Sequence, residues 1–310
     1  MTGAGPPGGD ERRSSPRVAR LQILAAAVLW GTTGTSQALA PEGATPMAVA
    51  SLRVTLGALT LVLVAASRRV LRRMRPRPVA IAGACLVVAQ LSFFAAVERT
   101  GVAVGTVVSI GSAPLIAGAL AYLLRGERPG VRWALATVLG LGGCVLLLAG
   151  GRSIDVDPVG VALALVVGAG YAGYTVASRD LIQNHPPDAV TAAAFAVAGL
   201  CMVPFLIGAD IGWAAKPSGI VIVGHLGVLT VGLAYALFAR GLTVVATAPA
   251  VTLTLAEPLT AGALGVVVLG EDLTPAAGTG IALMMAGLVL LAWPQREGAA
   301  KSPAASTMDA

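Results

Sequence analysis

The stretch APLIAGALAYLLRGE, residues 113–127, returns 144 residues later as EPLTAGALGVVVLGE, residues 257–271, without a gap. The Pro-Leu and Gly-Glu pairs carry this match, because alanine and leucine identities arise easily in an apolar chain. A single duplication of this length is far longer than the roughly 20 to 50 residues of solenoid repeats. It is typical instead of membrane proteins built from two copies of one helical bundle.

Composition places the chain in a lipid bilayer. The 310 residues are 56% hydrophobic and 12% charged, whereas soluble domains carry roughly 25% charged residues. A membrane-spanning helix needs roughly 20 apolar residues. Ten such stretches lie at about residues 20–39, 47–67, 79–97, 101–124, 131–150, 158–178, 188–208, 219–239, 246–269 and 274–293. The sequence therefore predicts an all-α integral membrane protein with ten transmembrane helices.

Basic residues orient these spans, because arginine and lysine near membrane segments stay on the cytoplasmic side. With the N-terminus inside, most of the 21 basic residues fall on the inner side. Both termini are then predicted to be cytoplasmic, in a multi-pass protein of the inner or plasma membrane. An odd number of helices in each copy would place the copies upside down, with Glu127 at the inner face and Glu271 at the outer face. Two inverted five-helix repeats are typical of alternating-access transporters.

The same division predicts the domain organisation. The first repeat covers residues 20–150, a linker covers 151–157, and the second repeat covers 158–293. The tails, residues 1–19 and 294–310, are rich in Gly, Pro, Ser and Ala and are predicted to be disordered. A cleavable signal peptide is a competing interpretation of the first span. Its removal would break the two equal halves, in which Trp30 matches Tyr174 at the same offset of 144 residues.

Two patterns that suggest other functions have simpler explanations. The net charge of +6 reflects basic loops between apolar spans rather than nucleic-acid binding. The string from Gly168 to Gly173 matches a dinucleotide fingerprint, but bilayer-length apolar runs are inconsistent with a parallel sheet. Close helix packing through small residues, as expected also between Gly101 and Gly105, explains it better.

Ionisable residues inside apolar spans are expensive unless paired or hydrated, and they indicate functional sites. Arg53 lies near the outer end of its span, and Glu257 lies near the membrane midplane. Their partners at the offset of 144 residues are Val197 and Ala113, so the other repeat builds the same scaffold without these charges. We therefore expect Arg53 and Glu257 to be functional, the alternative being a structural ion pair or gate. His225, near the end of its own span, is more typical of a satisfied core or headgroup contact.

Other residues at similar depth suggest what surrounds these charges. They are Trp30, Gln90, Ser112, Tyr171 and Thr254. Tryptophan and tyrosine usually prefer the membrane interface, so mid-depth positions indicate a cavity, although a glutamine can instead bond a neighbouring helix. Together with Arg53 and Glu257, these residues form the predicted substrate and coupling site.

Two prolines at equivalent positions, Pro114 and Pro258, are predicted hinges, because each removes one backbone hydrogen bond near the middle of its span. A fixed kink that only helps packing is the alternative. Glu127 and Glu271 end the same two spans. They are expected to lie in the first turn of the following helix and to satisfy free backbone donors there.

In this order and spacing, the short motifs resemble the ten-helix EamA-type branch of the drug/metabolite transporter superfamily, whose carriers hold two inverted five-helix repeats. The motifs are Trp30-Gly31-Thr32, Leu52-Arg53, Pro114-Leu115 with Gly126-Glu127, and Glu257-Pro258-Leu259 with Gly270-Glu271. The resemblance covers about Arg20 to Trp293. The first repeat has Ala113-Pro114 instead of Glu-Pro, so the acidic role carries over to Glu257 alone.

The resemblance implies a secondary carrier that exports amino acids or other small metabolites by alternating access, with coupling to protons or another gradient as a further expectation. Arg53 would attract a substrate carboxylate, and Glu257 would bind a substrate amine or a proton. The expected partners are this small molecule and the lipid bilayer, with no cofactor, metal or nucleic acid. Substrate identity, direction, coupling ion and oligomeric state stay open.

Other functions remain as alternatives. A drug exporter or a metabolite importer would share the architecture. A non-transporting membrane scaffold would move no solute and would tolerate replacement of Glu257. An enzyme would need a nucleophile with a base, or a metal cluster, and the two histidines, His185 and His225, lie outside any ligand spacing.

Overall fold

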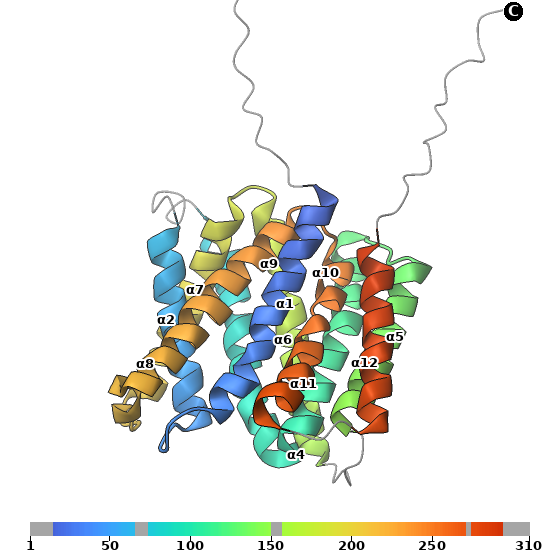
Figure 1. The fold of residues 1–310 in the computed structure, drawn as a ribbon. Helices are drawn as coiled ribbons and strands as arrows, with labels where there is room; N and C mark the ends of the chain where they lie inside the picture. The colour runs from blue at the N-terminus through green and yellow to red at the C-terminus, as the bar shows by residue number, and fades with distance from the viewer. Residues whose placement is uncertain (1–14, 66–73, 150–156, 271–273, 294–310) are drawn as a thin grey trace, which may run out of the picture.

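The chain folds into a bundle of helices (Figure 1). The computed structural model describes residues 15–65, 74–149, 157–270 and 274–293, and every regular element in these ranges is helical. The longer helices are α1 (Pro16–Ala38), α2 (Pro46–Val64), α4 (Pro76–Arg125), α5 (Val131–Ala149), α6 (Pro158–Ile182), α7 (Pro187–Met202), α11 (Ala256–Leu269) and α12 (Pro275–Ala292). The shorter elements are η1 (Val203–Leu206), η2 (Gly212–Ala215), α8 (Pro217–Gly224), η3 (His225–Leu233), α9 (Ala234–Leu242) and α10 (Thr247–Leu253).

Within the described ranges, eight helical segments are long and apolar enough to cross a membrane. They are Pro46–Val64, Pro76–Gly101, Val104–Arg125, Pro158–Ile182, Pro187–Leu206, Pro217–Leu242, Thr247–Leu269 and Pro275–Ala292. Helix α5 is apolar but shorter, over Val131–Leu147. Helix α1 has 23 residues, and its polar side chains, such as Arg20 and Gln22, lower its hydropathy. The all-helical membrane architecture is thus confirmed, whereas the count of ten spans stays a prediction.

The start of the first helix differs from the sequence prediction, and several predicted segments lie outside the described ranges. Helix α1 already begins at Pro16, inside the predicted N-terminal tail, because Ser15 caps it by accepting a hydrogen bond from the Val18 backbone N–H at 3.3 Å. The rest of that tail, the C-terminal tail and most of the predicted linker fall outside the described residues, as does Glu271.

Glycines have two different roles in the bundle. Gly101 has φ of 76° and joins the two membrane segments of α4, a backbone conformation that glycine adopts without strain. The expectation of close packing at Gly101 is wrong, since a Cβ there would meet nothing within 4 Å. At Gly168 and Gly170 the expectation holds, because a Cβ would lie 2.9 Å from the Ser109 carbonyl oxygen and 2.7 Å from that of Cys85. These glycines let α6 approach α4 closely, and no dinucleotide-binding sheet exists in the described part of the chain.

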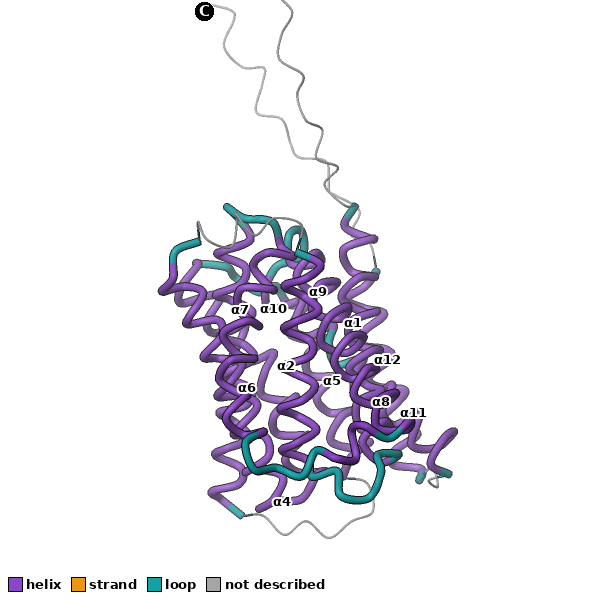
Figure 2. The backbone as a smooth tube through the Cα atoms, turned by 90° about the vertical axis from the view of Figure 1, so that its left-hand side faces the viewer, coloured by secondary structure: helices purple, strands orange, loops and turns teal. Residues whose placement is uncertain are grey.

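The start of α1 and the end of α12 lie at the same end of the bundle (Figures 1 and 2). We call it the arginine-rich end, because Arg20 and Arg132 make their hydrogen bonds there. Arg20 donates to the Ala292 carbonyl oxygen at 3.2 Å, and Arg132 donates to those of Leu290 at 2.5 Å and Trp293 at 2.6 Å. Such bonds satisfy the free carbonyls of a helix C-terminus. The first and last helices, and the start of α5, are therefore fixed to one another at this end.

Helices α5 and α12 pack together through a symmetric pair of contacts. A Cβ on Gly143 would lie 2.5 Å from the Gly280 carbonyl oxygen, and a Cβ on Gly287 would lie 2.7 Å from the Ala136 carbonyl oxygen. Gly143 matches Gly287, and Ala136 matches Gly280, at the 144-residue offset. Each contact is thus the counterpart of the other, as at an interface with a two-fold axis.

Candidate functional site

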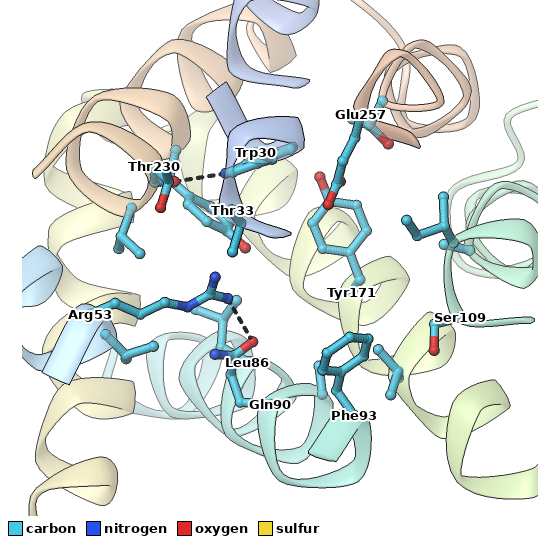
Figure 3. Close-up of a pocket in the computed structure, with 18 of the residues that line it drawn as sticks. Trp30, Thr33, Arg53, Leu86, Gln90, Phe93, Ser109, Tyr171, Thr230 and Glu257 are labelled. Atoms are coloured by element: carbon cyan, nitrogen blue, oxygen red, sulfur yellow. Dashed lines mark hydrogen bonds between the residues drawn. The ribbon is translucent and has the colours of Figure 1, made fainter. Parts of the chain in front are cut away.

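A cavity with a volume of about 200 Å³ lies inside the bundle (Figure 3). It is lined by both halves of the chain. The lining residues are Trp30, Thr33, Arg53, Val54, Leu86, Ala89, Gln90, Phe93, Thr106, Ser109, Ile110, Ala113, Val167, Tyr171, Phe195, Thr230, Val231, Tyr235, Thr254 and Glu257. Apolar walls with a few polar groups are typical of a site for a small molecule.

The cavity brings together most of the residues that the sequence predicts for the site. Those in the lining are Trp30, Arg53, Gln90, Tyr171, Thr254 and Glu257. Ser112 is not among them, because its side chain faces Gly168 of α6; its hydroxyl donates to the Ser109 carbonyl oxygen at 3.3 Å. Ser109, almost one helical turn earlier, lines the cavity instead. Depth in the membrane was readable from sequence, but the rotation of the helix decided which serine faces inward.

Arg53 reaches the cavity from α2 and is oriented by Gln90 of α4. Its Nη2 donates to Gln90 Oε1 at 3.3 Å. The Arg53 Nε and the Gln90 Nε2 are buried and find no partner within the described residues. Buried polar groups in proteins are nearly always hydrogen-bonded.

Glu257 lies beside a tightened turn of its membrane segment, Thr247–Leu269. Helix α10 ends at Leu253 and α11 begins at Ala256, and Thr254 and Leu255 between them keep right-handed helical φ and ψ. The Glu257 N–H donates to the Thr254 carbonyl oxygen, three residues earlier, at 2.9 Å, as in a 3₁₀ turn. Figure 3 shows Glu257 and Tyr171 pointing toward one another.

The two prolines have equivalent effects on their spans. Pro114 lies inside α4, where the missing N–H leaves the carbonyl of Ile110 without its helical partner. Pro258 lies in the membrane segment Thr247–Leu269, and its missing N–H leaves the carbonyl of Thr254, which accepts from the Glu257 N–H instead. The role of both prolines as hinges stays a prediction.

Trp30 is anchored by a feature that the sequence did not reveal. Residues His225–Leu233 form a π-helix, η3, and the Thr230 carbonyl oxygen accepts a hydrogen bond from Trp30 Nε1 at 2.8 Å. The ring of Trp30 also packs on Tyr235, with centroids 4.7 Å apart, and on Tyr171, at 5.9 Å. Tyr235 was missed, although its aromatic ring at mid-span gave the same signal as Tyr171. The π-helix itself has no signature in the sequence.

His225 stands apart from the cavity lining. Its Nε2 lies 2.8 Å from the Thr32 hydroxyl, which itself donates to the Leu29 carbonyl oxygen at 2.6 Å. The hydroxyl must then accept a hydrogen bond from His225. The His225 ring thus has a partner inside the bundle, in line with the structural role that the sequence predicts. Within the described residues, no group of three His, Cys, Asp or Glu side chains could hold a metal ion.

Arg53 and Glu257, a basic and an acidic residue, line one cavity but form no ion pair within the described residues. Salt bridges elsewhere in the described ranges join Arg99 to Asp157, Arg125 to Glu127 and Asp180, Arg179 to Glu127, and Arg240 to Asp188. Neither cavity charge takes part in any of them. A mostly apolar cavity that holds two separated ionisable residues, inside an all-helical apolar bundle, is typical of membrane transporters.

Comparison with known proteins gives the family. The model of the EamA-like transporter family matches residues 18–149 and 158–293, so the chain belongs to this family. The uncharacterized transporter YwfM of Bacillus subtilis (strain 168) is 44% identical over 279 residues, which are 89% of this chain and 94% of the relative. The threonine/homoserine exporter RhtA of Escherichia coli (strain K12) is 29% identical over 279 residues, 87% of this chain and 88% of RhtA.

A solved crystal structure is similar in fold, with a TM-score of 0.76 and 24% identity. The similarity covers 88% of this chain and 95% of the other. The family and the names of the relatives indicate a multi-pass membrane transporter rather than an enzyme.

Proposed function

We propose that this protein exports small zwitterionic metabolites, with amino acids as the first candidates, by secondary active transport. One observation carries the proposal. Arg53 and Glu257 present opposite charges to one cavity from the two halves of the chain, and neither forms an ion pair within the described residues. A charge in a membrane protein needs a partner, and a substrate with a carboxylate and an amine supplies one to each.

The two recognition groups differ in chemistry. The planar guanidinium of Arg53 matches a carboxylate geometrically, and the Gln90 amide beside it offers a further donor. Glu257 would accept the substrate ammonium, with the Tyr171 and Trp30 rings as neighbouring cavity walls. Faces of aromatic rings attract cations. The cavity would therefore orient a zwitterion between two distinct ends.

Cavity size favours a metabolite over a drug. The volume of about 200 Å³ lies below the roughly 300 to 1,000 Å³ of sites for drug-sized ligands. The name of RhtA, a threonine/homoserine exporter, agrees with a small amino acid as substrate of a related protein. A drug exporter of the same fold is the second candidate.

Internal symmetry supports the mechanism of alternating access. Helix α1 begins at the arginine-rich end (Figure 1), whereas α6, the first helix of the second half, ends there with Arg179. The paired contacts of Gly143 with Gly280 and of Gly287 with Ala136 relate α5 to α12 in the same way. Both features support two inverted five-helix repeats with ten spans, and basic residues favour a cytoplasmic arginine-rich end.

Glu257 also supplies a route for proton coupling. A single carboxylate cannot hold a substrate ammonium and a proton together, so the two would exclude each other. Protons that enter from outside would then release the substrate there, and the empty, deprotonated carrier would bind substrate from inside. Such mutually exclusive binding converts a proton gradient into export.

The proposal is tested by flux into inverted membrane vesicles. Labelled amino acids and other small zwitterions are supplied with and without an imposed pH gradient, for the wild type and for Glu257→Gln at matched abundance. We expect gradient-dependent accumulation by the wild type and its loss in the variant. Accumulation of hydrophobic cations but not of zwitterions would favour a drug exporter. No flux for any solute, with Glu257→Gln fully tolerated, would favour the scaffold.

A further inference from the structure

The cavity extends from the middle of the bundle toward one end only. Along α6, Val167 and Tyr171 line it, but toward the arginine-rich end Tyr174 is 0% exposed and Ser178 is 1% exposed. Along α10, Thr254 lines the cavity at the C-terminal end, whereas Thr247 at the start of the helix is 0% exposed. The half of the bundle next to the arginine-rich end is therefore packed.

Polar side chains are buried in this packed half. They are those of Tyr174, Ser178 and Thr247, and the Tyr174 hydroxyl lies near the side chains of Ser178 and Thr191. Fully buried core positions are mostly apolar in proteins. Three buried hydroxyls between the cavity and one end of the bundle could instead line a passage that is closed in this structure.

The internal repeat identifies the open counterparts of these positions. At the 144-residue offset, Tyr174 matches Trp30, which lines the cavity, and Ser178 matches Gly34. A Cβ on Gly34 would meet nothing within 4 Å, so this position faces open space. The two halves of the chain thus differ at equivalent positions: the space beside Gly34 is open, and the space around Ser178 is filled by neighbouring side chains.

An ion-pair cluster lies directly beyond Ser178 at the arginine-rich end. Arg179 Nε lies 3.4 Å from Glu127 Oε1, and Arg125 Nε donates to the same oxygen at 2.9 Å. Arg125 also pairs with Asp180, and Arg179 donates to the Leu242 carbonyl oxygen at 2.7 Å. The expected position of Glu127 in the first turn of α5 is wrong, because α5 begins at Val131 and the carboxylate binds two arginines instead.

This cluster connects the two halves of the chain. Arg125 and Glu127 belong to the first half, and Arg179 and Asp180 belong to the second. The nearby pair of Arg240 and Asp188, bonded at 3.0 and 2.7 Å, lies within the second half. Movement of one half against the other must break the pairs of Arg125 with Asp180 and of Glu127 with Arg179, and it can leave the pair of Arg240 with Asp188 intact.

We propose that the arginine-rich end contains the second mouth of the transport pathway, lined by Tyr174, Ser178 and Thr247 and held closed by the ion pairs of Glu127 with Arg179 and of Arg125 with Asp180. The inference rests on the proposed function, because it assigns the closed half of an alternating-access carrier. When the mouth opens, the three hydroxyls become polar lining for the solute, and the half around Gly34 closes.

The test measures the exposure of both mouths by thiol labelling. Cys85, Cys144 and Cys201 are replaced by alanine in the full chain, and Ser178→Cys or Thr33→Cys is added singly. A charged, membrane-impermeant thiosulfonate is applied to right-side-out and inverted vesicles. We expect slow labelling of Ser178→Cys, only from the side of the arginine-rich end, and faster labelling of Thr33→Cys from the opposite side.

Glu127→Gln then removes the charge that joins the two halves. Labelling of Ser178→Cys should rise about tenfold while labelling of Thr33→Cys falls, equivalent to a shift of about 1.4 kcal/mol between the two states. Asp188→Asn is the matched control, because it removes an ion pair within one half, and both rates should stay unchanged. A rise at Ser178→Cys without a fall at Thr33→Cys would indicate local loosening and overturn the inference, as would no change at either position.

A cross-link tests the same mouth by holding its two sides together. Arg125→Cys and Asp180→Cys, at positions that bond in this structure, are joined by a short bifunctional thiosulfonate. In a chain that carries only these two cysteines, solute flux should stop, and a reductant that cleaves the two mixed disulfides should restore it. If flux continues through the cross-linked protein, the proposal of a second mouth at this end is wrong, and the proposed transport function is unaffected. Reciprocal labelling without flux of any solute would support the mouth and contradict the proposed function.

Discussion

Arg53 on α2 donates a hydrogen bond to Gln90 on α4, with 3.3 Å between Nη2 and Oε1. The amide is neutral, so it orients the guanidinium against the cavity wall without cancelling its charge. A carboxylate at the same position would cancel it. Gln90 therefore fixes the position of the Arg53 guanidinium without neutralising its charge.

Gln90→Glu should weaken the apparent affinity for a transported zwitterion by about tenfold, equivalent to about 1.4 kcal/mol. The new carboxylate would pair with Arg53 and compete with that of the substrate. Saturation of flux in vesicles measures the effect. Gln90→Met is the control of similar length and should cost less, because it leaves the Arg53 charge free. Equal affinity in Gln90→Glu and wild type would contradict carboxylate binding at Arg53.

Glu257→Gln should abolish accumulation driven by a pH gradient, because an amide neither ionises nor carries an exchangeable acid proton. Exchange of labelled for unlabelled substrate, without a gradient, separates the two roles of the residue. Exchange that persists would assign proton binding to Glu257, and exchange that is lost would assign binding of the substrate amine. Gradient-driven accumulation at the wild-type rate would remove Glu257 from the mechanism.

Trp30→Phe should lower stability by about 1 kcal/mol, the usual net contribution of one hydrogen bond. The smaller ring keeps the aromatic contacts but loses the indole N–H that donates to the Thr230 carbonyl oxygen. Thermal unfolding in detergent measures the loss. Trp293→Phe is a suitable control, because Trp293 is 67% exposed and the change should leave the midpoint unaltered. An unchanged midpoint in Trp30→Phe would show that the π-helix does not depend on this bond.

Gly170→Ala should destabilise the bundle by about 1 to 3 kcal/mol, the usual cost of overpacking. The added methyl would lie 2.7 Å from the Cys85 backbone oxygen, which no side-chain rotation can relieve. Gly34→Ala is the matched control on a helix with open space around the new methyl, and it should be neutral or stabilising. Comparable unfolding midpoints for the two variants would contradict the close approach of α6 to α4.

Much of the site was visible in the sequence because membrane depth follows from position along an apolar run. Arg53, Glu257, Gln90 and Tyr171 could be selected in this way, and all four line the cavity. Ser112 fails because depth says nothing about the rotation of a helix, which packing of Gly168 against α4 decides here. Tyr235 could have been found by the same depth argument.

The sequence by itself determined an all-helical membrane protein and a duplication at an offset of 144 residues, because length of apolar runs and internal identity are properties of the chain alone. Only the tertiary structure decided that His225–Leu233 forms a π-helix, that Thr230 anchors Trp30 and that Glu127 joins Arg125 to Arg179. Each of these depends on contacts between helices distant in sequence. Packing and backbone hydrogen bonding set such contacts, and no local pattern of residues encodes them.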